Sequence, residues 1–212
     1  MTGVDQPILF DFPDHFETER LILCAPKPGD GRMINEAIVE SHAELKPWLL
    51  WADPLPSPEL SEEMNRKSVA QYISREVMRM NVLQKSDGRF VGITSLHHID
   101  WSVPAFEIGY WVRTSLAGKG YASESVHGIT DFAFGVLGAQ RMEIRCDPRN
   151  DRSAAVARRA GYTLEGTIRH DRRENDGMLS SAYVFGMIRP EWEALRNASQ
   201  TTTDSSSYAG NG

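Results

Sequence analysis

Residues 107–125 read EIGYWVRTSLAGKGYASES, and this stretch decides the fold. An apolar and aromatic run ends at Arg113, a loop with two closely spaced glycines follows, and a helical pattern starts at about Ala122. The pattern predicts a strand, a loop and the N-terminus of a helix. The first turn of a helix carries unpaired backbone N–H groups and partial positive charge, and glycines let an anion approach them. A phosphate-binding loop is therefore one interpretation, but glycine-spaced turns are common, and the spacing alone leaves the matter open.

The composition is that of an ordinary globular domain. The chain has 212 residues, of which 41% are hydrophobic and 25% charged, and its net charge is −6; this suffices for one domain with a sizeable core. The acidic balance disfavours duplex nucleic acid as a ligand and suits a cationic acceptor. The two cysteines, Cys24 and Cys146, lie in apolar runs, which predicts buried free thiols in a reducing compartment. No apolar stretch has the length of a membrane span, so a cytoplasmic protein without membrane contact is expected.

Alternation, helical periodicity and breaker residues divide the chain into elements. Strands are expected at residues 20–25, 82–85, 89–99, 105–112, 141–146, 163–173 and 179–188, and helices at 30–38, 41–53, 61–80, 122–137 and 151–160. Residues 1–16 are predicted to form an N-terminal arm, and residues 197–212, rich in Ser, Thr and Gly, a flexible C-terminal tail. The order predicts a single α/β domain whose mixed sheet is parallel where a helix connects two strands and antiparallel in the hairpins.

Several segments occur in the order and spacing of a known family. They are ETERLIL (17–23), HAELKPWLLWAD (42–53), EIGYWV (107–112), GKGYASES (118–125) and RMEIRCDPRNDRSAAVARRAGYTLEG (141–166). Together they resemble the GNAT superfamily of N-acetyltransferases, and more closely its RimJ/RimL-like branch. The resemblance implies an α/β (α+β) GNAT fold over residues 17–196, with a mixed, largely antiparallel seven-stranded sheet that is splayed between its fourth and fifth strands and flanked by helices.

The resemblance also implies acetyl-CoA as the co-substrate. The backbone of Tyr110, Trp111 and Val112 would pair with its pantetheine arm, Asn150 would contact the same arm, and the pyrophosphate would lie on the loop formed by Gly118, Lys119, Gly120, Tyr121 and Ala122. One departure from the family pattern is that Ala117 stands where the family has Gln or Arg. Positive charge from Arg113 or Lys119 is the expected substitute, and a solvated loop lysine is the alternative for Lys119.

Transfer of acetyl to an amine requires a base, a place for the oxyanion and an acid for the thiolate. By the resemblance, Glu107 is the candidate base and Ser153 the candidate acid. Two alternatives to Glu107 stay open: a later carboxylate near Arg172, namely Asp171 or Glu174, and a water relay without a single base. Helix capping is the simpler explanation for Asn150 and Ser153, and Tyr162 is expected to be a packing residue.

The acceptor pocket of the branch corresponds to His42, Trp48, Trp51 and Asp53, where two tryptophans would form a flat wall and a carboxylate would attract an ammonium group. Two core tryptophans are the alternative. His97 and His98 are neighbours on a strand, so their side chains should point to opposite faces, and no metal site is expected. Arginines 145, 149, 152, 158 and 159 are candidates for the adenosine phosphate of CoA or for a solvated face.

The favoured function is acetyl transfer from acetyl-CoA to a primary amine, with a protein N-terminal α-amine of the ribosomal-protein type as the acceptor. The alternatives are acetylation of a small molecule (an aminoglycoside, a polyamine or an amino acid) and a non-catalytic acyl-CoA-binding protein. Homodimerisation is expected only by analogy with the branch.

Overall fold

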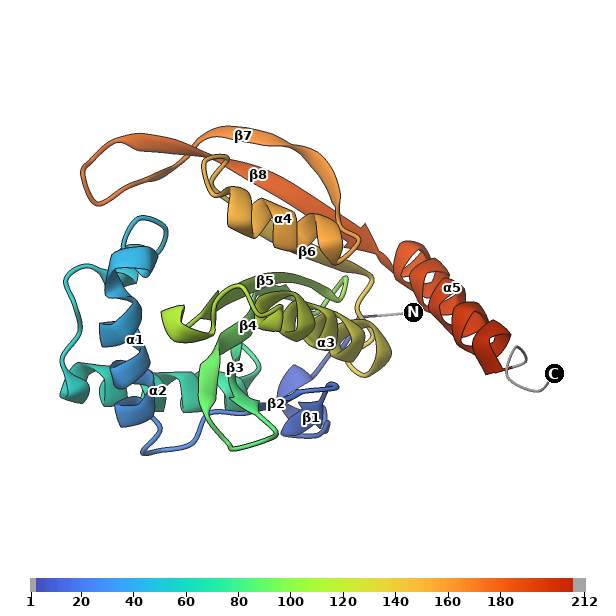
Figure 1. The fold of residues 1–212 in the computed structure, drawn as a ribbon, viewed down its shortest axis with the longest axis horizontal. Helices are drawn as coiled ribbons and strands as arrows, with labels where there is room; N and C mark the ends of the chain where they lie inside the picture. Colours follow the sequence, from blue (N-terminus) through green and yellow to red (C-terminus); the bar gives the residue numbers. More distant parts are fainter. Residues whose placement is uncertain (1–2, 208–212) are drawn as a thin grey trace.

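The computed structural model describes residues 3–207, which form one open sheet of eight strands in the order β1-β2-β3-β4-β5-β6-β8-β7 (Figure 1). The strands are β1 (His15–Glu17), β2 (Leu21–Cys24), β3 (Met78–Gln84), β4 (Phe90–Asp100), β5 (Ala105–Val112), β6 (Arg141–Cys146), β7 (Thr163–Arg173) and β8 (Leu179–Ile188). The α-helices are α1 (Gly31–Leu45), α2 (Pro58–Ser74), α3 (Tyr121–Gly135), α4 (Asp151–Arg159) and α5 (Arg189–Ser207), and the short 3-10 helices are η1 (Pro7–Leu9), η2 (Leu50–Ala52) and η3 (Thr114–Leu116). The mixed α/β fold is confirmed.

The eighth strand comes from the segment that was expected to be an arm. His15–Glu17 forms β1 and pairs antiparallel with β2. Further contacts hold the arm to the domain: Phe10 and Phe12 pack against the main core, and the Phe16 ring stacks on Phe132 at 4.6 Å between ring centroids. The sequence did not predict this strand because the aromatic residues of the segment follow no regular period. The strand count of seven was therefore wrong, and His15 and Phe16 of the predicted arm belong to β1.

Strands β5 and β6 are parallel, whereas every other neighbouring pair described in the sheet is antiparallel. Their pairing runs from Ala105 opposite Arg141 to Ile108 opposite Ile144 and then stops. On its other side, β5 stays paired with β4 as far as Val112. The last four residues of β5 therefore lack a partner on the β6 side, which is the expected splay.

Alternation along β5 divides its side chains between the two faces of the sheet. Phe106 and Ile108 belong to the main buried cluster, which includes residues of α3 and α4. Trp111 points the other way, into a second cluster with Ile34, Ala37, Ile38 and Leu45 of α1. Helices therefore cover both faces beside the splay, and β5 is the strand they share.

The C-terminal part of the chain is more ordered than its composition suggested. Helix α5 projects from the body (Figure 1) and continues to Ser207, so it includes part of the segment predicted as a tail; residues 208–212 lie outside the described part. Its first turn is attached to α3, because Trp192 stacks on Phe134 at 5.3 Å and donates to Asp131 Oδ1 at 2.6 Å. Among the described residues, no helix combines the length and the hydropathy needed to cross a membrane.

Candidate active site

At the splay between β5 and β6, Tyr110 is hydrogen-bonded to Ser153 of α4. The hydroxyl of Tyr110, from the unpaired end of β5, lies 2.8 Å from Ser153 Oγ on α4. Burial raises the pKa of Tyr110 to about 12, so its phenol stays protonated and can donate. Burial also raises the pKa of the nearby Cys146 thiol at the end of β6, an effect that the Ser153 hydroxyl partly offsets. The splay thus contains two hydroxyl groups and a protonated thiol.

The structure confirms helix capping for Asn150 but not for the Ser153 hydroxyl. Asn150 is the N-cap of α4, and its side-chain oxygen accepts from the backbone N–H of Ser153 at 3.0 Å. The Ser153 hydroxyl takes no part in the cap, because it faces Tyr110. Capping therefore fixes the backbone of Ser153 and leaves its Oγ in the splay, where it is available for chemistry.

The loop between β5 and α3 is small and leaves the helix N-terminus open. Gly118 has φ +75° and Gly120 has φ +85°, a left-handed conformation that residues with a Cβ rarely adopt. Gly120 is the N-cap of α3 and supplies no side chain to bond the first-turn N–H groups. The first-turn N–H groups of α3 therefore have no side-chain cap, as a phosphate site requires, in the loop of Gly118, Lys119, Gly120, Tyr121 and Ala122.

Arg20, at the start of β2, holds this loop in place. Glu124 in the first turn of α3 accepts from Arg20 Nε at 2.6 Å, from the Arg20 backbone N–H at 2.7 Å and from Thr18 Oγ1 at 2.5 Å. Arg20 also donates to the Lys119 carbonyl at 3.1 Å and lies over the Tyr121 ring at 4.6 Å. The sequence reasoning missed this role, although Thr18 and Arg20 lie in the quoted segment ETERLIL.

The cations expected beside the loop are distributed differently. Arg113 forms an ion pair with Glu40 of α1, so it is engaged on the other face of the sheet. Arg159 donates to Ser123 Oγ in the first turn of α3 at 3.4 Å. Of the arginine cluster, Arg159 therefore lies beside the loop. Arg145 and Arg149 are paired with the carboxylates of Glu143 and Asp147.

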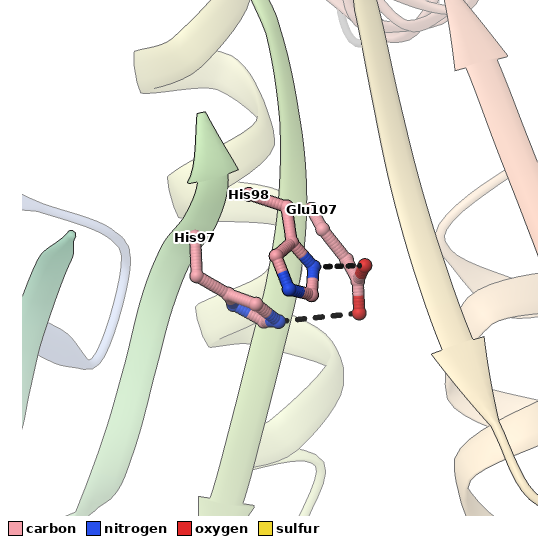
Figure 2. A group of neighbouring side chains, drawn as sticks. All are labelled: His97, His98 and Glu107. Atoms are coloured by element: carbon pink, nitrogen blue, oxygen red, sulfur yellow. Dashed lines mark hydrogen bonds and ion pairs between the residues drawn. The ribbon is translucent and has the colours of Figure 1, made fainter. Parts of the chain in front are cut away.

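Glu107 lies on the α1 face of β5, at its rigid, doubly paired part. Its side chain is 13% exposed, and its two carboxylate oxygens lie 3.2 Å from His97 Nε2 and 2.8 Å from His98 Nδ1 (Figure 2). Arg145 Nε lies 3.5 Å away. Burial alone would raise the pKa of Glu107, but the hydrogen bonds from His97 and His98 outweigh it and lower the pKa below its ordinary value. The carboxylate is therefore ionised and in contact with two imidazoles.

The expectation that His97 and His98 point to opposite faces was wrong. The register between β4 and β5 shifts between His97 and Asp100, and His98 has φ +48°. Strict alternation holds only along an uninterrupted ladder, and this irregularity turns the second histidine back towards the first. Both imidazoles consequently reach Glu107, with their ring centroids 5.0 Å apart.

The two later carboxylates that were alternatives for the base differ in their surroundings. Asp171 on β7 lies 3.7 Å from Arg145, which also contacts Glu107, so it belongs to the same charged network. Glu174 instead pairs with Arg172 at 3.0 Å. Of the two alternatives, only Asp171 is linked to Glu107, and the link runs through an arginine.

The residues expected to form the acceptor pocket are only partly together. The Trp51 ring is 38% exposed and lies 6.1 Å from the Trp111 ring, beyond Gly109 on the same face as Glu107. Asp53 forms an ion pair with Lys46 at 3.1 Å, so it does not offer a free carboxylate. His42 has a buried Nε2 without a hydrogen-bond partner in the described structure, and Trp48 is half-buried. The tip of the β7–β8 hairpin reaches this segment, because the Asn175 side chain donates to the Leu50 carbonyl at 3.3 Å.

Known proteins combine this fold and these motifs. The acetyltransferase (GNAT) domain family matches residues 20–163. The ribosomal-protein-serine acetyltransferase of Escherichia coli (strain K12) is 30% identical over 134 residues, which are 62% of this chain and 74% of that protein. YdaF of Bacillus subtilis (strain 168), named a putative ribosomal N-acetyltransferase, is 28% identical over 178 residues, which are 82% of this chain and 94% of that protein.

Solved structures agree on the fold. RimL, the ribosomal L7/L12 α-N-protein acetyltransferase, in complex with coenzyme A superimposes with a TM-score of 0.74 at 24% identity, over 81% of this chain and 95% of that one. The microcin C7 self-immunity acetyltransferase MccE, in complex with acetyl-CoA and AMP, gives 0.77 at 20% identity, over 84% and 97%. The chain belongs to the GNAT family of acetyltransferases and is an acyltransferase. Its relatives within that family include proteins named as ribosomal N-acetyltransferases, which supports the RimJ/RimL-like branch.

Proposed function

We propose that this N-acetyltransferase transfers the acetyl group of acetyl-CoA to a protein N-terminal α-amine. The main support is the continuity between the splay and the open N-terminus of α3. Gly109 to Val112 are unpaired on the β6 side, and the loop at Gly118 and Gly120 follows directly. A pantetheine arm in the splay would continue into a pyrophosphate on the loop. Arg159 beside the loop supplies positive charge that Ala117 does not, whereas Arg20 is paired with Glu124 and holds the loop in place.

In the proposed reaction the amine nitrogen attacks the thioester carbon, and the C–S bond breaks as the N–C bond forms. Glu107, ionised and adjacent to His97, accepts the proton that the amine loses, either directly or through a water molecule. Backbone N–H groups near Tyr110 and Trp111 hold the oxyanion. The departing thiolate takes a proton from Ser153, whose hydroxyl is bonded to the protonated Tyr110.

The acceptor class rests on the relatives and on the surface beside Glu107. The Escherichia coli relative is named for a ribosomal-protein serine, and the RimL structure for an α-amine of L7/L12. In this chain, exposed Trp51 and the charged network around Glu107 lie on one face, open to an apolar side chain followed by an ammonium group. Such an acceptor belongs to the cytoplasm. A small-molecule amine is the second candidate, because a similar fold occurs in an acetyltransferase solved with AMP.

The test is the release of CoA thiol with a panel of acceptors. Peptides that begin with Ser, Ala or Met would be compared with the same peptides blocked at the α-amine, with a blocked peptide that contains Lys, and with spermidine, an aminoglycoside and free amino acids. We expect saturable release only with free α-amines of peptides. If kcat/KM were higher for a small amine than for the peptides, the acceptor would be a small molecule and not a protein N-terminus. CoA binding without thiol release on any acceptor would refute catalysis.

A further inference from the structure

We propose that His97, His98 and Glu107 form a binding site for one divalent transition-metal ion of the zinc class. Nothing in the motifs of the chain indicates such a site, because adjacent histidines on a strand normally diverge. It arises from the irregularity in β4, which turns both imidazoles onto one carboxylate (Figure 2). Two imidazole nitrogens and a carboxylate oxygen are a ligand set that zinc commonly uses, with water in the fourth position.

The distances suit this coordination. One imidazole nitrogen from each histidine and a Glu107 oxygen all lie within 4.8 Å of one another. Ligand atoms about 2.0–2.1 Å from a tetrahedral ion are separated by roughly 3.3 Å. His97 Nε2 lies 3.2 Å from Glu107 Oε1 and His98 Nδ1 lies 2.8 Å from Glu107 Oε2, so each histidine faces a different oxygen at about this separation. Side-chain rotation then brings both imidazoles and one carboxylate oxygen around a single ion.

The charge around the cluster favours a cation. Its ion-pair network contains four carboxylates and two guanidinium groups, so its net charge is −2 when the histidines are neutral; the members are Glu107, Glu143, Glu165, Asp171, Arg141 and Arg145. Arg145 is the group that opposes a metal, but its shortest contact, 2.6 Å, is with Glu143 and not with Glu107. Both oxygens of Glu107 already face the histidines, so an ion bound between them would replace these two hydrogen bonds.

The backbone at His98 gives independent support. His98 has φ +48°, a left-handed conformation that costs a residue with a Cβ about 1–2 kcal/mol of conformational free energy. Such strain persists where the surrounding structure holds the backbone in place. The strained conformation directs Nδ1 of a side chain that is 75% exposed onto Glu107. A surface histidine needs no such conformation to be solvated. Coordination of an ion together with His97 and Glu107 would explain the left-handed backbone of His98, and the exposure of its side chain lets an ion reach the site.

Metal binding has a consequence that rests on the proposed function. An ion on Glu107 occupies the carboxylate that would accept the amine proton, so zinc inhibits acetyl transfer while it is bound. Binding itself requires neither acetyl-CoA nor an acceptor. The two proposals can therefore fail separately.

The experiment uses the full chain without an affinity tag. Zn²⁺ is titrated in competition with a chromophoric chelator, and Co²⁺ is added in parallel to record its visible absorption. We expect one ion per chain and the intense visible bands of four-coordinate Co²⁺. His97→Ala and His98→Asn should each weaken zinc binding at least about tenfold; asparagine is chosen because it tolerates the left-handed conformation. His127→Ala, on α3 and outside the cluster, is the matched control and should change the affinity less than about twofold.

Each contrary result has a defined meaning. No bound ion at micromolar zinc, or an unchanged affinity in His98→Asn, would overturn the site. A strong near-ultraviolet thiolate-to-cobalt band would assign the ion to Cys24 or Cys146 and overturn it as well. Thermal melts of the variants confirm that each is folded before its affinity is compared.

Discussion

Replacing Gly120 by alanine tests whether the loop before α3 binds acetyl-CoA. Gly120 has φ +85°, so alanine would add about 1–2 kcal/mol of backbone strain. Its Cβ would also lie 3.2 Å from Arg20 Nη2, which must then move by a few tenths of an ångström. Arg20 cannot move alone, because it also bonds Glu124 and the Lys119 carbonyl. The substitution therefore both strains the loop and displaces the contacts that hold it.

The backbone strain and the loss of loop contacts can be measured separately, as a change in Tm and a change in Kd. For a chain of this length, 1–2 kcal/mol of strain lowers Tm by roughly 2–8 °C. Displacing one N–H donor from a pyrophosphate costs about 1.5–3 kcal/mol, and 1.4 kcal/mol is a tenfold change in Kd. Gly120→Ala should therefore lower Tm by several degrees and raise the Kd for acetyl-CoA by about tenfold or more. Calorimetric titration measures the Kd without turnover, and thermal unfolding measures Tm.

Two glycines provide matched controls. Gly138, after α3, has φ +75°, and a Cβ there would meet nothing within 4 Å, so Gly138→Ala adds the same strain far from the loop. Its Tm should fall equally, while its Kd stays within about twofold of the wild type. Gly118→Ala has the same φ and the same open space within the loop, so it separates strain from the contact with Arg20. Equal changes of Kd in Gly120→Ala and Gly138→Ala would refute the assignment of the loop.

Three further predictions concern the splay and the fold. Glu107→Gln should lower kcat about 10²–10⁴-fold with little change in the Kd for acetyl-CoA; a rate within threefold of wild type, measured by thiol release, would exclude it as the base. Ser153→Ala should reduce kcat more than it weakens acetyl-CoA binding, and the reverse ratio would make Ser153 a binding residue. The hydrogen bond from Arg113 lowers the pKa of Glu40 from 4.5 to about 2. A carboxylate whose pKa is lowered by folding stabilises the folded state at pH values above its unfolded pKa. About 1–2 kcal/mol of the free energy of unfolding, allowing for solvent screening, should therefore be lost as the pH falls from about 5 to about 2. Chemical denaturation of Glu40→Gln should lack that pH-dependent part, and an unchanged slope would contradict the pairing.

The sequence predicted the central elements because their signals are local. Periodicity and the glycine spacing located β5 and α3 to within about two residues. The helix expected at 61–80 was too long: Arg75 takes φ +65° and ends α2 at Ser74, and β3 starts at Met78. Apolar residues in that region fit both a helical and an alternating period. A left-handed residue other than glycine has no composition signal, so the boundary was not predictable.

The candidate site was predictable only where a motif or a neighbouring residue fixes it. Glu107 and the capping pair at the start of α4 follow from segments with a fixed spacing. The partner of Arg113 is Glu40, which lies 73 positions earlier, so the sequence could not show that this arginine is engaged. The reversal of His98 depends on a register shift between two strands, and period-two alternation assumes that no such shift occurs.

Gly109 explains how the two faces of β5 can act on one reaction. Glu107 and Trp111 face α1, whereas Tyr110 faces α4 and bonds Ser153, so the candidate base and acid lie on opposite sides of the strand. Gly109 is the position between Glu107 and Trp111, and it lies just beyond Ile108, where pairing with β6 ends. A Cβ at Gly109 would lie 2.9 Å from the His97 ring, so any larger residue there would push that ring from its place beside Glu107. Under the proposed function, Gly109 therefore puts no side chain between an amine beside Glu107 and a thioester in the splay.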